Sequence, residues 1–133
     1  MGLELKDTSL KSTFALANGA NHVHSATFDL GPGDKVALAE FLLSAPVLVV
    51  AEIVDLDTIT YSVEMDEDPA MGSPTTVIPA IIVQTGVHPD AGAAAATARF
   101  RVPTNCERYV RVTATNSGAG NASTKSAVLE LLL

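Results

Sequence analysis

Hydrophobic and polar residues alternate along much of the chain, which is the pattern of half-buried β-strands. The clearest example is residues 99–116, where an alternating segment, a break at residues 103–105 and a second alternating segment follow one another. In the second segment Val110, Val112 and Ala114 fall on one face. The unit predicts two neighbouring strands joined by a proline-containing turn, in a hairpin-like arrangement.

Gly, Pro, Asn and Ser residues divide the rest of the chain into short segments, as in β-sandwiches and barrels. The expected strands are residues 21–30, 47–54, 58–65, 75–85, 93–102, 108–115 and 125–133. Residues 47–54 are almost continuously apolar, which predicts a central strand. Pro79 leaves open whether residues 75–85 form one strand or two.

Two segments have some helical character. Residues 37–44 are rich in Ala and Leu and are compatible with one or two helical turns, and residues 91–98 are rich in Ala. The second segment leads directly into an alternating pattern, so we expect a strand there. The sequence thus predicts an all-β fold, a β-sandwich or jelly roll of about seven to eight antiparallel strands with little or no helix.

The length of 133 residues predicts a single domain over residues 1–133, in which residues 1–20 are a candidate for an extended N-terminal arm. Residues 1–7 lack the basic and apolar regions of a signal peptide. No apolar run approaches the ~20 residues that span a bilayer. The only cysteine, Cys106, rules out an internal disulfide and fits synthesis in a reducing cytoplasm. We therefore expect no membrane partner.

Charge is unevenly distributed in the sequence. The formal net charge is −7, which argues against nucleic acid as a partner. Residues 52–68 contain seven acidic residues and no basic one, whereas Arg99, Arg101, Arg108 and Arg111 lie close together later in the chain. We hypothesise that these arginines form one positive strip that faces an acidic partner, with the 52–68 region of a second copy as the candidate.

Histidine and cysteine residues are too few to suggest a metal site. His22 and His24 are two residues apart and share one face of a strand, but a site needs further ligands. The other candidates are His88 and Cys106, which are far away in the sequence. We expect Cys106 to be a buried, inert thiol. No metal ligand is assigned.

The acidic residues do not define a catalytic pair. Asp55 and Asp57 follow one apolar segment, and residues 66–68 follow the next, so a hairpin would hold the two groups at opposite ends. Neither a nucleophile elbow nor a glycine-rich phosphate-binding loop is present. We expect Tyr109 to be a packing tyrosine whose hydroxyl meets the backbone. The sequence predicts a non-enzymatic protein without catalytic or cofactor-binding residues and without a cofactor.

An ordered series of segments carries a resemblance to a known family. The segments are Phe28-Asp29-Leu30-Gly31, Val47-Leu48-Val49-Val50, Thr60-Tyr61-Ser62-Val63-Glu64, Asp66-Glu67-Asp68, Gly72-Ser73-Pro74-Thr75, Val102-Pro103 and Glu107-Arg108-Tyr109-Val110-Arg111-Val112. In this order they resemble the small jelly-roll cement, or decoration, proteins of tailed-phage heads. The resemblance implies a structural protein on the capsid exterior, which binds the major capsid protein, bridges neighbouring capsomers and stabilises the shell against internal DNA pressure. Threefold junctions of such a shell slightly favour a homotrimer over a dimer at twofold seams.

A second resemblance rests on Val102-Pro103 and residues 109–116, followed by a glycine-containing loop. These segments are similar to the last two strands of fibronectin type III modules. This resemblance implies an adhesion or carbohydrate-binding module. The chain departs from that family because it has no tryptophan and is longer than such a module.

Overall fold

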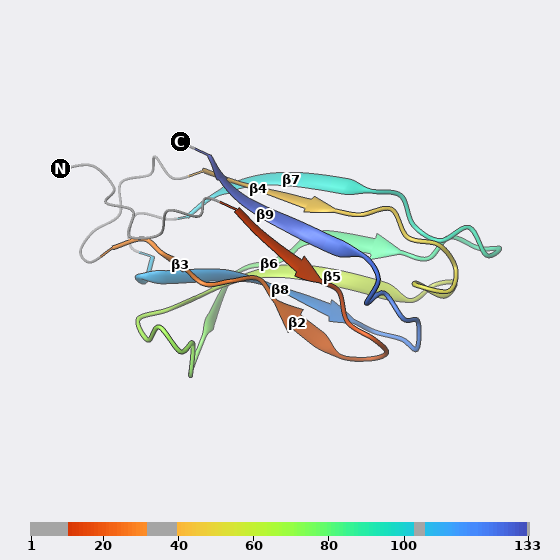
Figure 1. Cartoon of the computed structure of the whole chain (residues 1–133), viewed down its shortest axis with the longest axis horizontal. Coiled ribbons are helices and arrows are strands. Elements are labelled where there is room, and N and C mark those ends of the chain that lie inside the picture. The colour runs from red at the N-terminus through yellow and green to blue at the C-terminus, as the bar shows by residue number, and fades with distance from the viewer. Residues whose placement is uncertain (1–10, 32–39, 103–105, 133) are drawn as a thin grey trace.

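The computed structural model describes residues 11–31, 40–102 and 106–132, in which nine β-strands form two facing antiparallel sheets (Figure 1). The strands are β1 (Lys11–Ala15), β2 (His22–His24), β3 (Phe28–Asp29), β4 (Glu40–Ala45), β5 (Thr58–Asp66), β6 (Thr75–Thr85), β7 (Ala96–Arg101), β8 (Tyr109–Asn116) and β9 (Ser126–Leu132). Among these residues no helix has the length and apolar character that crossing a membrane requires.

The strand order is that of a jelly roll. Sheet 1 has the order β1-β9-β4-β7, and sheet 2 has the order β2-β8-β5-β6, with β3 also pairing with β8. β2 and β3 are two parts of one broken strand, because both pair antiparallel with β8. When they are counted as one strand, the first strand pairs with the last, the second with the seventh, the third with the sixth and the fourth with the fifth. This nested pairing, rolled into two sheets, confirms the predicted fold class.

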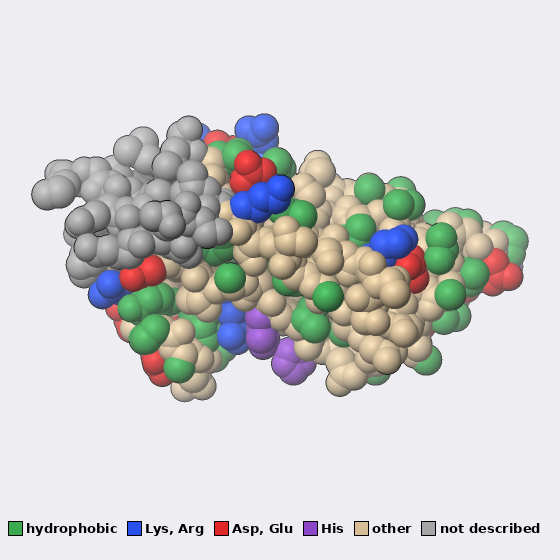
Figure 2. All heavy atoms as spheres, viewed as in Figure 1, with side chains coloured by type: hydrophobic (Ala, Val, Ile, Leu, Met, Phe, Trp, Pro, Cys, Tyr) green, Lys and Arg blue, Asp and Glu red, His purple; other side chains and the backbone are tan. Residues whose placement is uncertain are grey.

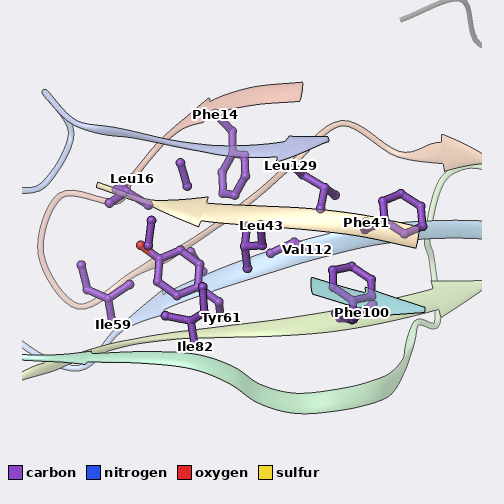
Figure 3. Close-up of a cluster of buried hydrophobic side chains, with 14 of the residues drawn as sticks. Phe14, Leu16, Phe41, Leu43, Ile59, Tyr61, Ile82, Phe100, Val112 and Leu129 are labelled. Atoms are coloured by element: carbon purple, nitrogen blue, oxygen red, sulfur yellow. The ribbon is translucent and has the colours of Figure 1, made fainter. Parts of the chain in front are cut away.

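The inner faces of the two sheets enclose one hydrophobic core (Figure 3). Phe41 of β4 lies in this core without any exposed surface. Its ring stacks on Phe100 of β7 at 5.1 Å and meets the edge of Phe28 at 5.5 Å. Sheet 2 contributes the fully buried Tyr61 and Val112. Strands from both sheets therefore meet in a single packed layer.

Three strands follow their sequence pattern closely. Residues 58–65 and 108–115 correspond to β5 and β8, and residues 125–133 correspond to β9, which lies inside sheet 1 between β1 and β4. The alternating apolar residues of all three strands point into the core. Residues 75–85 form one strand, β6, whose pairing with β5 shifts in register near Pro79.

The prediction of a central strand at residues 47–54 is wrong. This segment is a loop in which the N–H groups of Glu52 and Ile53 both donate to the Val49 carbonyl oxygen, at 2.9 and 3.1 Å. Leu48 and Ile53 are buried, and their spacing of five residues is not that of a strand. Apolar content alone suggested a strand, but the loop uses these two side chains as anchors.

Residues 37–44, whose composition is compatible with one or two helical turns, belong from residue 40 onward to β4. Its burial alternates, with Phe41, Leu43 and Ala45 inside. Hydrogen bonding to β7 on one side and to β9 on the other makes β4 a central strand of sheet 1. Tertiary pairing thus overrides the helical propensity of Ala and Leu. Residues 37–39 lie outside the described residues.

The single strand expected at residues 21–30 is interrupted at Ser25. The Ser25 side chain is buried, and its hydroxyl oxygen accepts a hydrogen bond from the Val112 N–H at 3.0 Å. The next amide, Ala26 N–H, turns toward the Ser12 hydroxyl at 2.9 Å. This irregularity changes which residues face inward, so that Phe28 is buried although the sequence alternation from Val23 places it on the other face.

The hairpin-like pairing expected within residues 99–116 is also wrong. β7 pairs with β4 in sheet 1, whereas β8 pairs with β5 and the broken first strand of sheet 2. The connection therefore crosses from one sheet to the other, as the jelly-roll winding requires. The predicted break at residues 103–105 lies outside the described residues.

Residues 11–20 are part of the sandwich and not of an N-terminal arm. β1 pairs with β9 over its full length, from Lys11 opposite Glu130 to Ala15 opposite Ser126. Phe14 and Leu16 are in the core. Residues 1–10 lie outside the described part of the chain.

Candidate interaction surface

The two neighbouring histidines lie on the outer face of sheet 2. The ring centroids of His22 and His24 are 5.2 Å apart, and Nδ1 of His24 is 3.1 Å from the Thr113 hydroxyl oxygen. Burial lowers the pKa of His24, and the nearby Arg111 guanidinium lowers it further. His88 lies elsewhere, in the loop after β6. Within residues 11–31, 40–102 and 106–132, no three His, Cys, Asp or Glu side chains gather as metal ligands would.

The two acidic groups lie at opposite ends of β5, as predicted. Asp66 is at the end of β5, where its carboxylate accepts hydrogen bonds from the N–H groups of Asp68 and Ser73 at 3.0 and 2.9 Å. These bonds lower the pKa of Asp66. The other group precedes β5, and its Asp55 contacts the loop after β6. Asp66 organises its own loop, and Asp55 links two loops.

The four arginines do not form one strip. Arg99 and Arg101 lie on the outer face of sheet 1, where both approach Glu40, at 3.9 and 3.6 Å. Arg111 lies on β8 of sheet 2, and Arg108 directly precedes β8; both are on the opposite side of the sandwich. They pair with Asp29 and Glu64 respectively, at 2.8 and 2.9 Å. β7 and β8 belong to different sheets, and their apolar residues face the shared core, so their arginines lie on opposite outer faces. Each arginine has an acidic neighbour within the same chain.

The packing role expected of Tyr109 is filled by Tyr61. Tyr109 is half-buried, and the Arg108 guanidinium carbon lies 5.2 Å from its ring centroid. The packing tyrosine with a bonded hydroxyl is Tyr61, which donates to Gln84 Oε1 at 2.8 Å inside the core. Cys106 is buried, as expected.

Exposed apolar side chains are concentrated at one end of the molecule. Among the described residues, the large hydrophobic side chains that are exposed belong to the loop before β5, to the end of β6 or to the loop that follows β6; they are Val47, Val49, Val54, Leu56, Val83 and Val87. Leu56 is the most exposed of them, at 76%. We call residues 46–57 and 86–95, together with Val83, the apolar tip. It forms the right-hand end in Figure 1, where hydrophobic side chains gather in Figure 2.

The two loops of the apolar tip are packed tightly against each other. Leu48 and Ala93 exchange two backbone hydrogen bonds, each 2.9 Å long. Gly86 and Gly92 allow this approach, because a Cβ atom would lie 2.1 Å from the Val54 carbonyl oxygen and 2.0 Å from that of Leu48 respectively. The exposed valines are therefore held on a defined backbone.

Polar side chains connect the same loops. The Asp55 carboxylate accepts a hydrogen bond from the Asp90 N–H at 2.9 Å and lies 2.8 Å from Nδ1 of His88. Beneath them, the buried Gln84 donates from Nε2 to the carbonyl oxygens of Pro46 and Ala94, at 2.7 and 3.0 Å. The sequence showed the valines and aspartates of this region, but only the fold brings the two loops together.

A buried carboxylate anchors the first loop to the start of β9. Glu52 accepts hydrogen bonds from the Val49 N–H at 2.9 Å, from Lys125 Nζ at 3.0 Å and from the Thr124 hydroxyl at 3.2 Å. Burial by itself would raise the pKa of Glu52, but the hydrogen bonds from Val49 and Lys125 outweigh it and hold the pKa below its ordinary value.

Replacing Glu52 with Gln is expected to lower the free energy of unfolding by about 1–3 kcal/mol at neutral pH, because charge-assisted hydrogen bonds are lost. The contribution of a carboxylate with a lowered pKa is complete above its unfolded pKa and disappears as the pH falls through the folded pKa. The difference between wild type and Glu52→Gln should thus shrink at an acidic pH below the ordinary pKa of a glutamate side chain. Urea denaturation at both pH values measures it.

The matched control is Glu130→Gln, on the outer face of β9. It should change stability by less than about 0.5 kcal/mol. A Glu52→Gln penalty that is the same at both pH values would show that the carboxylate charge does not anchor the loop.

Comparison with known proteins identifies no family. No family model matches the chain, and no curated protein matches it. Murine APRIL, crystallised at pH 8.5, is similar in structure, with 11% identity, a TM-score of 0.45, and coverage of 92% of this chain and 99% of that chain. A family 16 carbohydrate-binding module is 10% identical, with a TM-score of 0.41, and covers 91% of this chain and 74% of its own. The xylan-binding module CBM15 is 11% identical, with a TM-score of 0.41, and covers 98% of this chain and 97% of its own. The chain is an all-β jelly-roll domain on the strength of its own strand order.

Proposed function

We propose that the chain is a structural protein of the phage virion, a capsid cement protein that binds the outer surface of the head and bridges neighbouring capsomers of the major capsid protein. The observation that carries this proposal is the apolar tip, since an exposed apolar patch on a rigid domain is typical of a protein interaction surface. The ordered resemblance to head decoration proteins supports the same function. The protein acts by binding and not by catalysis.

The proposed mechanism is mechanical. Packed DNA pushes a thin shell outward, and the seams between capsomers are its weakest places. A β-sandwich that spans a seam adds contact area there, and a stable interface buries about 1,600 Å² in total. A homotrimer on a threefold junction would engage several capsomers at once, so that modest individual contacts become strong together.

Thermal release of DNA tests this function. Heads of the phage that encodes the chain, prepared without it, should release their DNA at a lower temperature than complete heads, and adding the purified chain should restore the difference. An unrelated β-sandwich protein of similar size is the control for addition. Equal release temperatures with and without the chain would contradict the cement function, and binding of the chain to a cell-surface glycan in place of heads would favour an adhesion module.

A further inference from the structure

We infer that the apolar tip docks on a protein surface of the head shell that is apolar at its centre and carries Lys or Arg at its rim. This inference rests on the proposed function and assigns the contact to one end of the sandwich. It follows from four properties of the tip: its exposed side chains, its charge, its rigid backbone and the strained conformation of Leu56.

The exposure of the tip is unusual for a solvated loop pair. The two loops bury Leu48, Ile53 and Ala93 as anchors and direct most of their other large apolar side chains outward. Leu56 and Val47 are 76% and 58% exposed. Single exposed hydrophobic residues are common, but a group of them at one end marks a binding surface.

The charge of the tip selects the kind of partner. The tip contains the carboxylates of Glu52, Asp55, Asp57 and Asp90, and its loops contain no Lys or Arg. Lys125, at its base, is bound to Glu52. The net negative charge disfavours a phosphate-rich surface and also disfavours docking of two tips on each other. A partner with basic residues around an apolar centre is complementary to it.

The backbone of the tip is organised before any partner binds. The Leu48–Ala93 hydrogen bonds and the contacts of Asp55 with Asp90 and His88 fix the loops relative to each other. Because little conformational entropy remains to be lost, such a surface gains affinity from each apolar contact.

Leu56 gives the most specific support. Its φ angle is +69°, in the left-handed region that favours glycine and is a genuine outlier for a bulky residue. The turn itself is satisfied by the backbone, because the Leu56 N–H donates to the Gly86 carbonyl oxygen at 2.9 Å. Glycine would meet the needs of this turn without strain, so a leucine held here in solvent is explained by a contact that its side chain makes elsewhere.

The variant Leu56→Gly distinguishes an effect on docking from an effect on folding stability. This variant relieves the strained conformation, so we expect its urea midpoint to match or approach that of the wild type while its affinity for heads, measured by co-sedimentation, falls at least about tenfold. Val87→Lys and Val87→Glu test the charge: both remove an apolar contact, but the lysine variant should bind more weakly. Thr97→Lys, on the outer face of sheet 1, is the matched control and should bind as the wild type does.

The outcomes distinguish this inference from the function on which it rests. If the wild type does not bind heads, the cement function fails and the docking assignment fails with it. If the wild type binds and Leu56→Gly binds equally well, only the docking assignment is overturned. It is also overturned if Leu56→Gly lowers the oligomer mass in light scattering, which would make the tip an interface between copies, or if Val87→Glu binds more weakly than Val87→Lys.

Discussion

Phe41→Ala is expected to lower the free energy of unfolding by about 3–5 kcal/mol, the range for removing a large aromatic side chain from a packed core. Phe41 has no exposed surface. Its ring stacks on Phe100 and forms a T-shaped contact with Phe28, so its loss removes contacts within sheet 1 and between the sheets. Because stabilities of whole domains are about 5–15 kcal/mol, this variant should lose a large fraction of the stability of the fold.

Leu42→Ala is the matched control for Phe41→Ala. Leu42 is the next residue of β4, it points to the other side of sheet 1, and it is half-buried. Its truncation should cost less than about 1.5 kcal/mol. Urea denaturation with comparison of m-values measures both variants. Equal losses would mean that the buried aromatic contacts of Phe41 contribute no more to stability than a half-buried side chain of the same strand.

Gly92→Ala is the second prediction with a large effect. At Gly92, with a φ angle of +66°, a Cβ atom would lie 2.0 Å from the Leu48 carbonyl oxygen and 2.9 Å from Val49 Cα. These are backbone atoms, so rotation of a side chain cannot relieve the clash. The loops must separate, and we expect a loss of about 2–4 kcal/mol from strain and lost hydrogen bonds together. Amide exchange at Leu48 and Ala93 should become faster.

Gly19→Ala isolates the steric part of this effect. Gly19 has nearly the same conformation, with a φ angle of +73°, but no atom lies within 4 Å of its added Cβ. It should cost only the intrinsic strain of a left-handed residue, about 1–2 kcal/mol. If Gly92→Ala and Gly19→Ala cost the same, the two loops of the apolar tip are not held in contact. On the proposed function, Gly92→Ala should also weaken head binding without changing any exposed apolar side chain.

In β5, β8 and β9 the period-two pattern of apolar residues is sufficient to predict the strand. Ile59, Tyr61 and Val63 alternate with small polar residues, and this pattern identifies both the strand and its buried face. Residues 40–54 show its limit. Both β4 and the loop after it are rich in apolar residues, and the difference between them lies in the hydrogen-bonding partners that β7 and β9 provide to β4.

The sequence predicts the positions of only some of the charged residues correctly. Acidic residues near Asp55 and Asp66 were correctly placed at opposite ends of one strand, because a strand separates its ends by its length. The prediction that the arginines form one strip is wrong, because the chain passes from one sheet to the other between Arg101 and Arg108. The strain at Leu56 could not be predicted, since a φ angle depends on the turn that the Gly86 carbonyl oxygen completes.

The sequence by itself determined the all-β class and the inward faces of the regular strands, because side-chain alternation is a local property of an extended backbone. Tertiary structure alone decided which strands pair, that residues 47–54 form a loop, and which valines remain in solvent. The physical reason is that hydrogen-bonding partners and burial come from segments distant in the chain. The apolar tip exists only because Leu48 meets Ala93, 45 residues later, and turns its neighbours outward.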